Sequence, residues 1–301
     1  MRHLRAENKS PKTVRSYEQT ARLFLDWVRA LPLGGDPPPV ENLDQVRRAH
    51  VETWLGELLD GGRTPSTVLT RYAGLQALAK WATDPDEKVI LSSFMAGVGR
   101  PNVPEAEPPT LTGADVKALL ATCKGTGFAA RRDTAIIRVL VDTGVRAAEC
   151  AGLTTEPGAV DLDDDVVRVV RKGRRGLRPV AVPFGAKTGQ ALARYERVRA
   201  RHPLARLDAY WLGVTGRGAM TTGGIRQMLA RRAELAGLDR VHPHLLRHTS
   251  VDAWLSAGGG EGDAMRLFGW RSRQMLDRYA AARQQDRAIQ AHRRISPGDR
   301  L

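Results

Sequence analysis

The chain has 301 residues, with 47 Lys or Arg against 33 Asp or Glu, which gives a formal net charge of +14 at pH 7. Apolar residues make up 42% and charged residues 27%, a globular balance that excludes a disordered or fibrous chain and favours about two domains. No apolar run approaches the roughly 20 residues that cross a bilayer, and the N-terminus carries no apolar signal region, so we expect a cytoplasmic protein with no membrane partner.

The first hundred residues predict an all-helical domain. Residues 10–27 begin with Ser-Pro and continue with apolar residues at helical spacing, the pattern of a capped amphipathic helix. A second helix is predicted over residues 44–59, where a Gly-Gly pair follows, and a third over residues 65–81. We therefore place a first domain at residues 1–100.

A proline-rich segment follows this domain. Residues 101–109 contain four prolines, the composition of a semi-rigid linker, so we place the domain boundary there and a second domain at residues 110–301.

The second domain mixes helices with a few short strands. Helices are predicted over residues 112–122 and 131–142. Three segments rich in β-branched valine, at residues 160–162, 166–171 and 178–182, predict a small antiparallel sheet because Gly and Asp turns bound them. Everything after Gly185 has the pattern of helices joined by Gly- and Pro-containing turns.

The positive charge gathers in the second domain. Residues 1–100 hold 14 basic and 12 acidic residues, whereas residues 101–301 hold 33 and 21. A folded domain with excess positive charge favours a polyanion, and nucleic acid is the commonest one in a cell. An Arg-rich composition bias gives the same excess, since 39 of the 47 basic residues are Arg, so charge alone leaves both interpretations open.

Residues 142–149 (DTGVRAAE) combine a glycine turn with an arginine at the start of the next helix. Arg146 would lie beside free backbone N–H groups, a ready phosphate site, and Glu149 would hold its side chain from three residues further on. Taken alone, the segment is more typical of a surface ion pair.

Residues 171–178 (RKGRRGLR) hold four arginines and one lysine at a predicted hairpin turn, as a turn pressed against a phosphate backbone would. Lys172 is the only lysine between Lys124 and Lys187. Lysine can act as a general acid, whereas arginine does not give up its proton in a protein, so Lys172 is a candidate proton donor. Chance leaves a lone lysine about as often.

Residues 241–249 (VHPHLLRHT) place His244 and Arg247 on one face of a predicted helix, as a phosphate clamp would require. His244 and His248 are also spaced for zinc, but no third ligand is evident. The two cysteines, Cys123 and Cys150, cannot complete a four-ligand site or a disulfide framework. We therefore predict no metal site.

Two aromatic residues complete the candidates. Trp270 and Tyr279 are each typical of core packing when considered alone. The indole N–H of Trp270 is nevertheless a donor that could reach a phosphate oxygen, and a tyrosine hydroxyl is a possible nucleophile.

Taken in chain order, six of these residues resemble the catalytic set of the tyrosine recombinase (phage integrase) family: Arg146, Lys172, His244, Arg247, Trp270 and Tyr279. Residues 142–153 (DTGVRAAECAGL), 244–249 (HLLRHT) and 269–279 (GWRSRQMLDRY) resemble the two arginine boxes and the nucleophile segment of the family, and residues 8–17 the opening of its core-binding domain. The resemblance therefore covers the whole chain. Trp270 departs from it, since most members carry His there and only some carry Trp.

The resemblance implies a mainly α fold with a small antiparallel β-sheet in the second domain. The N-terminal domain would be the helical, SAM-like core-binding domain, and residues 110–301 the α+β catalytic domain with a C-terminal tail helix. Because little chain precedes Asn8, we expect no additional arm-site DNA-binding domain.

The resemblance also implies a mechanism. Tyr279 attacks a DNA phosphorus, forms a 3′-phosphotyrosyl bond and releases a 5′-hydroxyl, with no cofactor, ATP or metal ion required. Arg146, Arg247 and the Trp270 N–H would bind the non-bridging oxygens, and Glu149 would orient its neighbours. His244 would assist the tyrosine proton. Lys172 would protonate the leaving 5′-oxygen.

The implied partner is double-stranded DNA with a specific recombination site, held by two domains that close around it as a clamp. Contacts to the DNA are predicted for basic residues of the first helix and of the hairpin: Lys9, Lys12, Arg15, Arg171, Arg174, Arg175 and Arg178. Four protomers would assemble on two sites, with the tail after Tyr279 docking on a neighbour. Host or element-encoded directionality factors are further expected partners, and the protein would be associated with the nucleoid.

Several roles share this chemistry. The leading hypothesis is the integrase or excisionase of a phage or other mobile element. A Xer-like resolvase of chromosome or plasmid multimers is the first alternative, and Trp270 in place of His weighs against it. A type IB topoisomerase would relax DNA without strand exchange. A catalytically silent DNA-binding protein is the alternative from another class.

Overall fold

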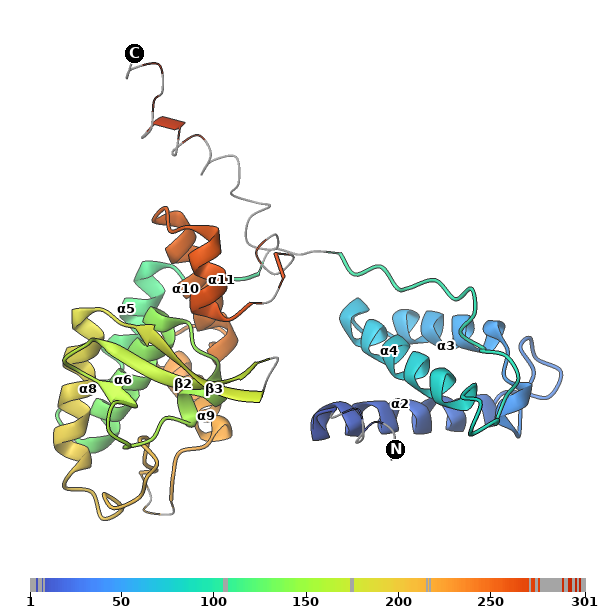
Figure 1. Cartoon of the computed structure of the whole chain (residues 1–301), viewed down its shortest axis with the longest axis horizontal. Coiled ribbons are helices and arrows are strands. Elements are labelled where there is room, and N and C mark those ends of the chain that lie inside the picture. The colour runs from blue at the N-terminus through green and yellow to red at the C-terminus, as the bar shows by residue number, and fades with distance from the viewer. Residues whose placement is uncertain are drawn as a thin grey trace. The chain divides into compact units, whose positions relative to one another are not determined.

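Figure 1 shows the computed structural model of the chain. The structure describes residues 9–104, 108–173, 176–214, 216, 218–270 and the single positions 4, 7, 272, 273, 276, 289, 292, 293, 296 and 298, without the side chains of residues 172 and 173. The chain divides into two compact units, Met1–Glu105 and Ala106–Leu301, and the division lies within the proline-rich segment. None of the described helices is both long and apolar enough to span a membrane.

Over its described residues, the first unit contains the α-helices α2 (Pro11–Arg29), α3 (Arg48–Asp60) and α4 (Pro65–Ala82) and the 3₁₀ turn η1 (Leu43–Gln45). Ser10 and Thr64 cap α2 and α4, each side-chain oxygen accepting the N–H of the residue three positions on, and a proline follows each cap. The two helices meet closely at Gly74, because a Cβ there would lie 2.7 Å from Thr20. Phe24, packed against Trp54, lies in the core between the helices.

The helix predicted over residues 44–59 is interrupted in the structure. Val46 has an extended backbone and is buried in the core, so the chain leaves the 3₁₀ turn before α3 begins at Arg48. The gain from burying Val46 outweighs the continuous helical pattern of the segment.

In the second unit, helices pack against one face of a three-stranded sheet (Figure 1). The strands are β1 (Val160–Asp161), β2 (Val166–Gly173) and β3 (Gly176–Pro183), in the order β1-β2-β3 with both pairs antiparallel. The helices are α5 (Gly113–Ala121), α6 (Phe128–Thr143), α7 (Ala147–Ala151), α8 (Ala186–Arg199), α9 (Thr222–Leu235), α10 (Pro243–Ser256) and α11 (Glu261–Phe268). The predicted fold class, mainly α with a small antiparallel sheet in the second domain, is confirmed.

Helix α6 runs through the middle of this unit. Its residues Ile136, Ile137 and Leu140 are fully buried, and it packs against α8 and α10. Val167 and Val169 of β2 point into the same core, with the alternation of a strand that has one buried face. The end of α6, the start of α7, β2 and α10 thereby belong to one compact unit.

Candidate active site

Two left-handed glycine turns meet at the site. Gly144, with a φ of 58°, ends α6, and Gly269, with a φ of 64°, ends α11. A Cβ on Gly144 would lie 2.5 Å from the Phe268 ring, so the turns pack without space for a side chain. Arg146 follows the first turn by two residues, and Trp270 directly follows the second.

Arg247 of α10 joins the two turns. Its side chain is only 2% exposed, and Nη1 donates to the Gly144 carbonyl at 2.6 Å while Nη2 donates to the Phe268 carbonyl. The guanidinium lies over the rings of Phe268 and Trp270, with Cζ 5.7 and 5.6 Å from their centroids. Cation–π contacts of this kind fix the plane of the guanidinium.

Arg146 also reaches the turn that ends α11. It caps α7, its Nη1 donates to Glu149 Oε1 at 2.7 Å, and its Nη2 donates to the Gly269 carbonyl at 3.3 Å. Arg146 and Arg247 thus bind the carbonyls of two consecutive residues, Gly269 and Phe268. Two guanidinium groups from distant parts of the chain are therefore brought to the same turn.

Glu149 is the buried carboxylate of this group. Besides Nη1 of Arg146, it accepts the Arg146 backbone N–H at 3.0 Å, and its Oε1 lies 3.4 Å from Nε of Arg171. Burial by itself raises the pKa of Glu149, but the hydrogen bonds from Arg146 and the charges of Arg171 and Arg146 outweigh burial and hold that pKa below its ordinary value. Glu149 is therefore ionised at neutral pH and fixes both arginines.

His244 lies in the first turn of α10, one turn before Arg247, with its ring 4.6 Å from that of His248. Partial burial of the ring and the charges of Arg247, His242 and Arg146 lower the pKa of His244 below 6.5. At neutral pH His244 is thus uncharged and has a nitrogen free of a proton. Among the described residues, no three His, Cys, Asp or Glu side chains gather as a metal-binding group.

Trp270 packs in a small apolar cluster at the edge of the unit. It is 8% exposed, its ring centroid is 5.5 Å from that of Phe268, and Leu276 and Val251 belong to the same cluster. Its ring supports the guanidinium of Arg247. The donation of its N–H to a phosphate oxygen stays a prediction.

The structure describes the two remaining candidates of the catalytic set, Lys172 and Tyr279, only in part. Lys172 pairs with Leu177 across the hairpin, which places its backbone next to the Gly173–Gly176 end of the β2–β3 pair. Tyr279, Arg174, Arg175 and the predicted tail helix lie outside the described residues, apart from a few single positions of the tail. Their roles stay predictions.

The hairpin arginines divide into two environments. Arg178 is exposed, whereas Arg171, its partner across the strands, is 8% exposed and directed toward Glu149. The sequence predicted Arg171 as an exposed DNA contact of a basic hairpin, but its side chain is buried. The sequence does contain a signal for this burial: Arg171 lies two residues after Val169 and four after Val167, so it faces inward with them.

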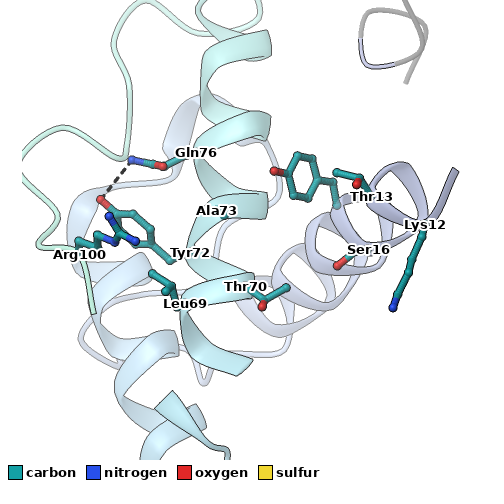
Figure 2. A pocket seen from close by; sticks show the side chains of 10 residues that line it. Lys12, Thr13, Ser16, Leu69, Thr70, Tyr72, Ala73, Gln76 and Arg100 are labelled. Atoms are coloured by element: carbon teal, nitrogen blue, oxygen red, sulfur yellow. Dashed lines mark hydrogen bonds between the residues drawn. The ribbon is translucent and has the colours of Figure 1, made fainter. Parts of the chain in front are cut away.

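The first unit carries a groove of about 670 Å³ between α2 and α4 (Figure 2). Lys12 and Ser16 line it from α2, Thr70 and Gln76 line it from α4, and Arg100 lines it from the segment that follows α4. No carboxylate is among the described residues that line this groove. Of the other predicted contacts, Arg15 is exposed on α2, and Lys9 has its Nζ 3.6 Å from Glu7.

Family models match both units. The model described as Phage integrase family matches residues 109–286, and the model described as Phage integrase, N-terminal SAM-like domain matches residues 1–85. Among related sequences, tyrosine recombinase XerC of Corynebacterium efficiens is 29% identical over 260 residues, which cover 86% of this chain and 80% of the relative. Tyrosine recombinase XerD of Corynebacterium glutamicum is 28% identical over 273 residues, covering 87% and 85%.

Solved structures have the same fold. The Tn1549 transposon integrase in complex with transposon right end DNA matches with a TM-score of 0.72 at 18% identity, covering 98% of this chain and 97% of that one. XerH site-specific recombinase bound to difH substrate matches with a TM-score of 0.70 at 18% identity, covering 91% and 77%. Because the first family model spans more than half of its length, the chain belongs to the phage integrase family, the enzymes known as tyrosine recombinases.

Proposed function

We propose that the protein is a site-specific recombinase that cleaves and rejoins duplex DNA through a covalent 3′-phosphotyrosyl bond at Tyr279. The observation that carries the proposal is the meeting of Arg146 and Arg247 over the carbonyls of Gly269 and Phe268. Two fixed guanidinium groups at one place suit the two non-bridging oxygens of a phosphodiester.

The charges of the site suit the transition state of this reaction. The Tyr279 oxygen forms a bond to phosphorus while the bond from phosphorus to the 5′-oxygen breaks. The phenolic proton passes to His244, whose lowered pKa leaves it uncharged, and Lys172 gives a proton to the 5′-oxygen. Arg146 and Arg247 meet the charge that develops on the non-bridging oxygens, an electrostatic contribution available without reorganisation.

Duplex DNA is the proposed substrate for three reasons. The second unit carries most of the net charge of +14, the described residues that line the groove of the first unit include Lys12 and Arg100 and no carboxylate, and the Tn1549 integrase named above is a complex with DNA. Four protomers on two sites would form the working complex, and directionality factors would bias it. Such a protein would act at the nucleoid.

The biological role we propose is integration or excision of a mobile element, a role that the name of the Tn1549 integrase supports. Resolution of chromosome or plasmid multimers is the second candidate, which the relatives named XerC and XerD favour. Mapping the crossover junction in the source genome separates them: an attachment site and an excisionase gene at an inserted element support the first role, and a crossover site without either supports the second.

The mechanism is tested with a nicked suicide DNA substrate that carries the mapped site. Wild type should form a protein–DNA adduct that survives denaturation, because the nick releases the 5′-hydroxyl strand and blocks religation. Tyr279→Phe should bind the same DNA with similar affinity and form no adduct, since only the phenolic oxygen is removed. An adduct in Tyr279→Phe would refute the nucleophile assignment, and no adduct with wild type would favour a DNA-binding role without catalysis.

A further inference from the structure

Arg171 lies near the end of the β2–β3 hairpin, and its side chain is buried. Among the described side chains from residue 170 to 179, all the others are exposed, with Val170 at 54% and Leu177 at 75%. Among the described residues of this part of the hairpin, Arg171 makes side-chain contacts with other elements, in addition to the ladder between the two strands.

The guanidinium of Arg171 touches two other elements. Its Nε lies 3.4 Å from Oε1 of Glu149 on α7, and its Nη1 donates to the carbonyl of Arg266 on α11 at 3.3 Å. A Cβ on Gly269 would lie 3.1 Å from Nη1, so the turn after α11 is closed over this side chain. One residue thus connects the hairpin, the Arg146 segment and the turn that leads to Trp270.

These contacts are not what stability alone would select. Within the described part of the chain, Nη2 of Arg171 is buried without a hydrogen-bond partner and Nε meets Glu149 only as an ion pair, and an unsatisfied buried donor is costly. An apolar side chain of similar length would fill the same space without this penalty, as replacements of buried ion pairs have shown in general. A positional role explains why a guanidinium stands there.

We propose that Arg171 is a positioning residue for the proton-donation step. It holds the end of β2 against Glu149 and α11, and Lys172 is the next residue of that strand, with its Cα about 3.8 Å away. Any shift of the Arg171 backbone moves Lys172 relative to the phosphate held by Arg146. This inference rests on the proposed function, in which Lys172 protonates the leaving 5′-oxygen.

The experiment compares two DNA substrates in single-turnover cleavage by the full-length protein. Both carry the mapped site, with oxygen or sulfur at the 5′-bridging position of the scissile phosphate. With sulfur, the Tyr279 oxygen forms its bond to phosphorus, the phosphorus–sulfur bond breaks, and the thiolate leaves without a proton from Lys172. A defect confined to proton donation therefore disappears on the sulfur substrate.

Arg171→Met is expected to cleave the oxygen substrate about 10²-fold more slowly than wild type, as a misplacement of the order of 1 Å would cause. On the sulfur substrate its rate should return to that of wild type. Arg171→Lys keeps the charge and loses the fork, so it should show the same pattern with a smaller loss. Equal losses on both substrates, for either variant, would overturn the proposal and assign Arg171 to the phosphate site or to the fold.

Two further variants make the result unambiguous. Lys172→Ala shows how large a pure defect in proton donation is. If the sulfur substrate does not restore the cleavage rate of Lys172→Ala, the proposed role of Lys172 is wrong, independently of Arg171. Arg168→Met is the matched control, because Arg168 lies on the same strand but binds Asp161 and the Gly158 carbonyl away from the site. It should leave both rates unchanged. Should Arg171→Met fail to fold, as a thermal unfolding scan would reveal, the comparison is decided on Arg171→Lys.

Discussion

Arg247 and Arg146 differ in how deeply their side chains are buried and in how much of the fold they stabilise. Arg247 is buried and satisfies the carbonyls of two turns, whereas Arg146 is half exposed, with a side-chain exposure of 45%. If Arg146 is removed, Glu149 keeps Arg171 and a backbone N–H as partners. The two arginines have matching roles toward a phosphate and unequal roles in the fold.

We therefore expect Arg247→Ala to lower both stability and cleavage, and Arg146→Ala to lower mainly cleavage. Each buried carbonyl left without a donor by Arg247→Ala costs about 1–3 kcal/mol. Either variant should lose about 3–4 kcal/mol of transition-state stabilisation, a fall of about 10²–10³-fold in the cleavage rate. Urea unfolding and single-turnover cleavage measure the two effects. Equal losses of stability in both variants would contradict the assignment of Arg247 to the junction of the turns.

His248 should make the fold sensitive to acid. Burial, together with the nearby His244 and Arg247, lowers the pKa of His248 from its ordinary 6.5 to about 4. Between these pH values the unfolded chain binds a proton on His248 that the folded chain does not, so the free energy of unfolding falls as the pH falls from 6.5 toward 4. His248→Asn, which cannot titrate, should show a shallower decline in urea unfolding across this range. Parallel declines in the two proteins would exclude His248 as the source.

At this scale, local spacing predicted some contacts and missed others. The separation of three residues between Arg146 and Glu149 predicted their ion pair, because a helix start fixes the geometry of that pair. The contact of Arg171 with Glu149 joins a strand to a helix, and no local spacing specifies a partner in another element. The strand alternation indicated only which way Arg171 faces.

At the level of elements, the two glycine turns decide where the arginines lie. Gly144 has a left-handed φ and no room for a Cβ beside Phe268 and Ser250, whereas Gly237 has a similar φ of 67° and open space around it. A comparison of substitutions at Gly144 and Gly237 therefore distinguishes the cost of backbone strain from the cost of disturbing the contact between the turns.

Gly144→Ala should destabilise the protein more than Gly237→Ala and should also slow cleavage. Both substitutions force a left-handed alanine, at a cost of about 1–2 kcal/mol. Only Gly144→Ala also pushes the Phe268 turn away and so displaces the carbonyls that Arg146 and Arg247 bind. Thermal unfolding and adduct formation with the suicide substrate measure both effects. Normal cleavage by a folded Gly144→Ala protein would show that the contact between the turns is dispensable.

Helices with strong end signals were predicted well, and irregular segments were not. Pro11 and Pro65 mark the starts of α2 and α4, since a Ser or Thr cap precedes each. The irregular connection between α8 and α9 has no such end signal. Arg199 stabilises it by donating to four backbone carbonyls between residues 205 and 210. An arginine that satisfies backbone carbonyls has the same local pattern as one that binds DNA, so the sequence could not distinguish these roles.

On the scale of the whole molecule, the two units have separate cores. One core gathers around Phe24, Trp54 and Leu75, and the other around Ile136, Leu140 and Trp211. Composition predicted the division, because four prolines in nine residues are unsuited to a packed element. Each unit buries enough apolar surface to fold by itself, so we expect both to unfold cooperatively when produced separately.

The connection between the units should then contribute to DNA binding by making the second contact intramolecular. Residues 106–301 alone, or mixed with a separate 1–105 fragment, should bind the mapped site about 10²–10⁴-fold more weakly than the intact chain, because linkage replaces a free concentration by an effective one. Inserting a long Gly-Ser segment between residues 104 and 108 should give an intermediate affinity, since effective concentration falls as the connection lengthens. Equilibrium gel-shift titration at one fixed salt concentration measures each affinity, because charge-driven binding depends steeply on salt. If residues 106–301 bind as tightly as the whole chain, the groove of the first unit at Lys12 and Arg100 makes no contribution to DNA recognition.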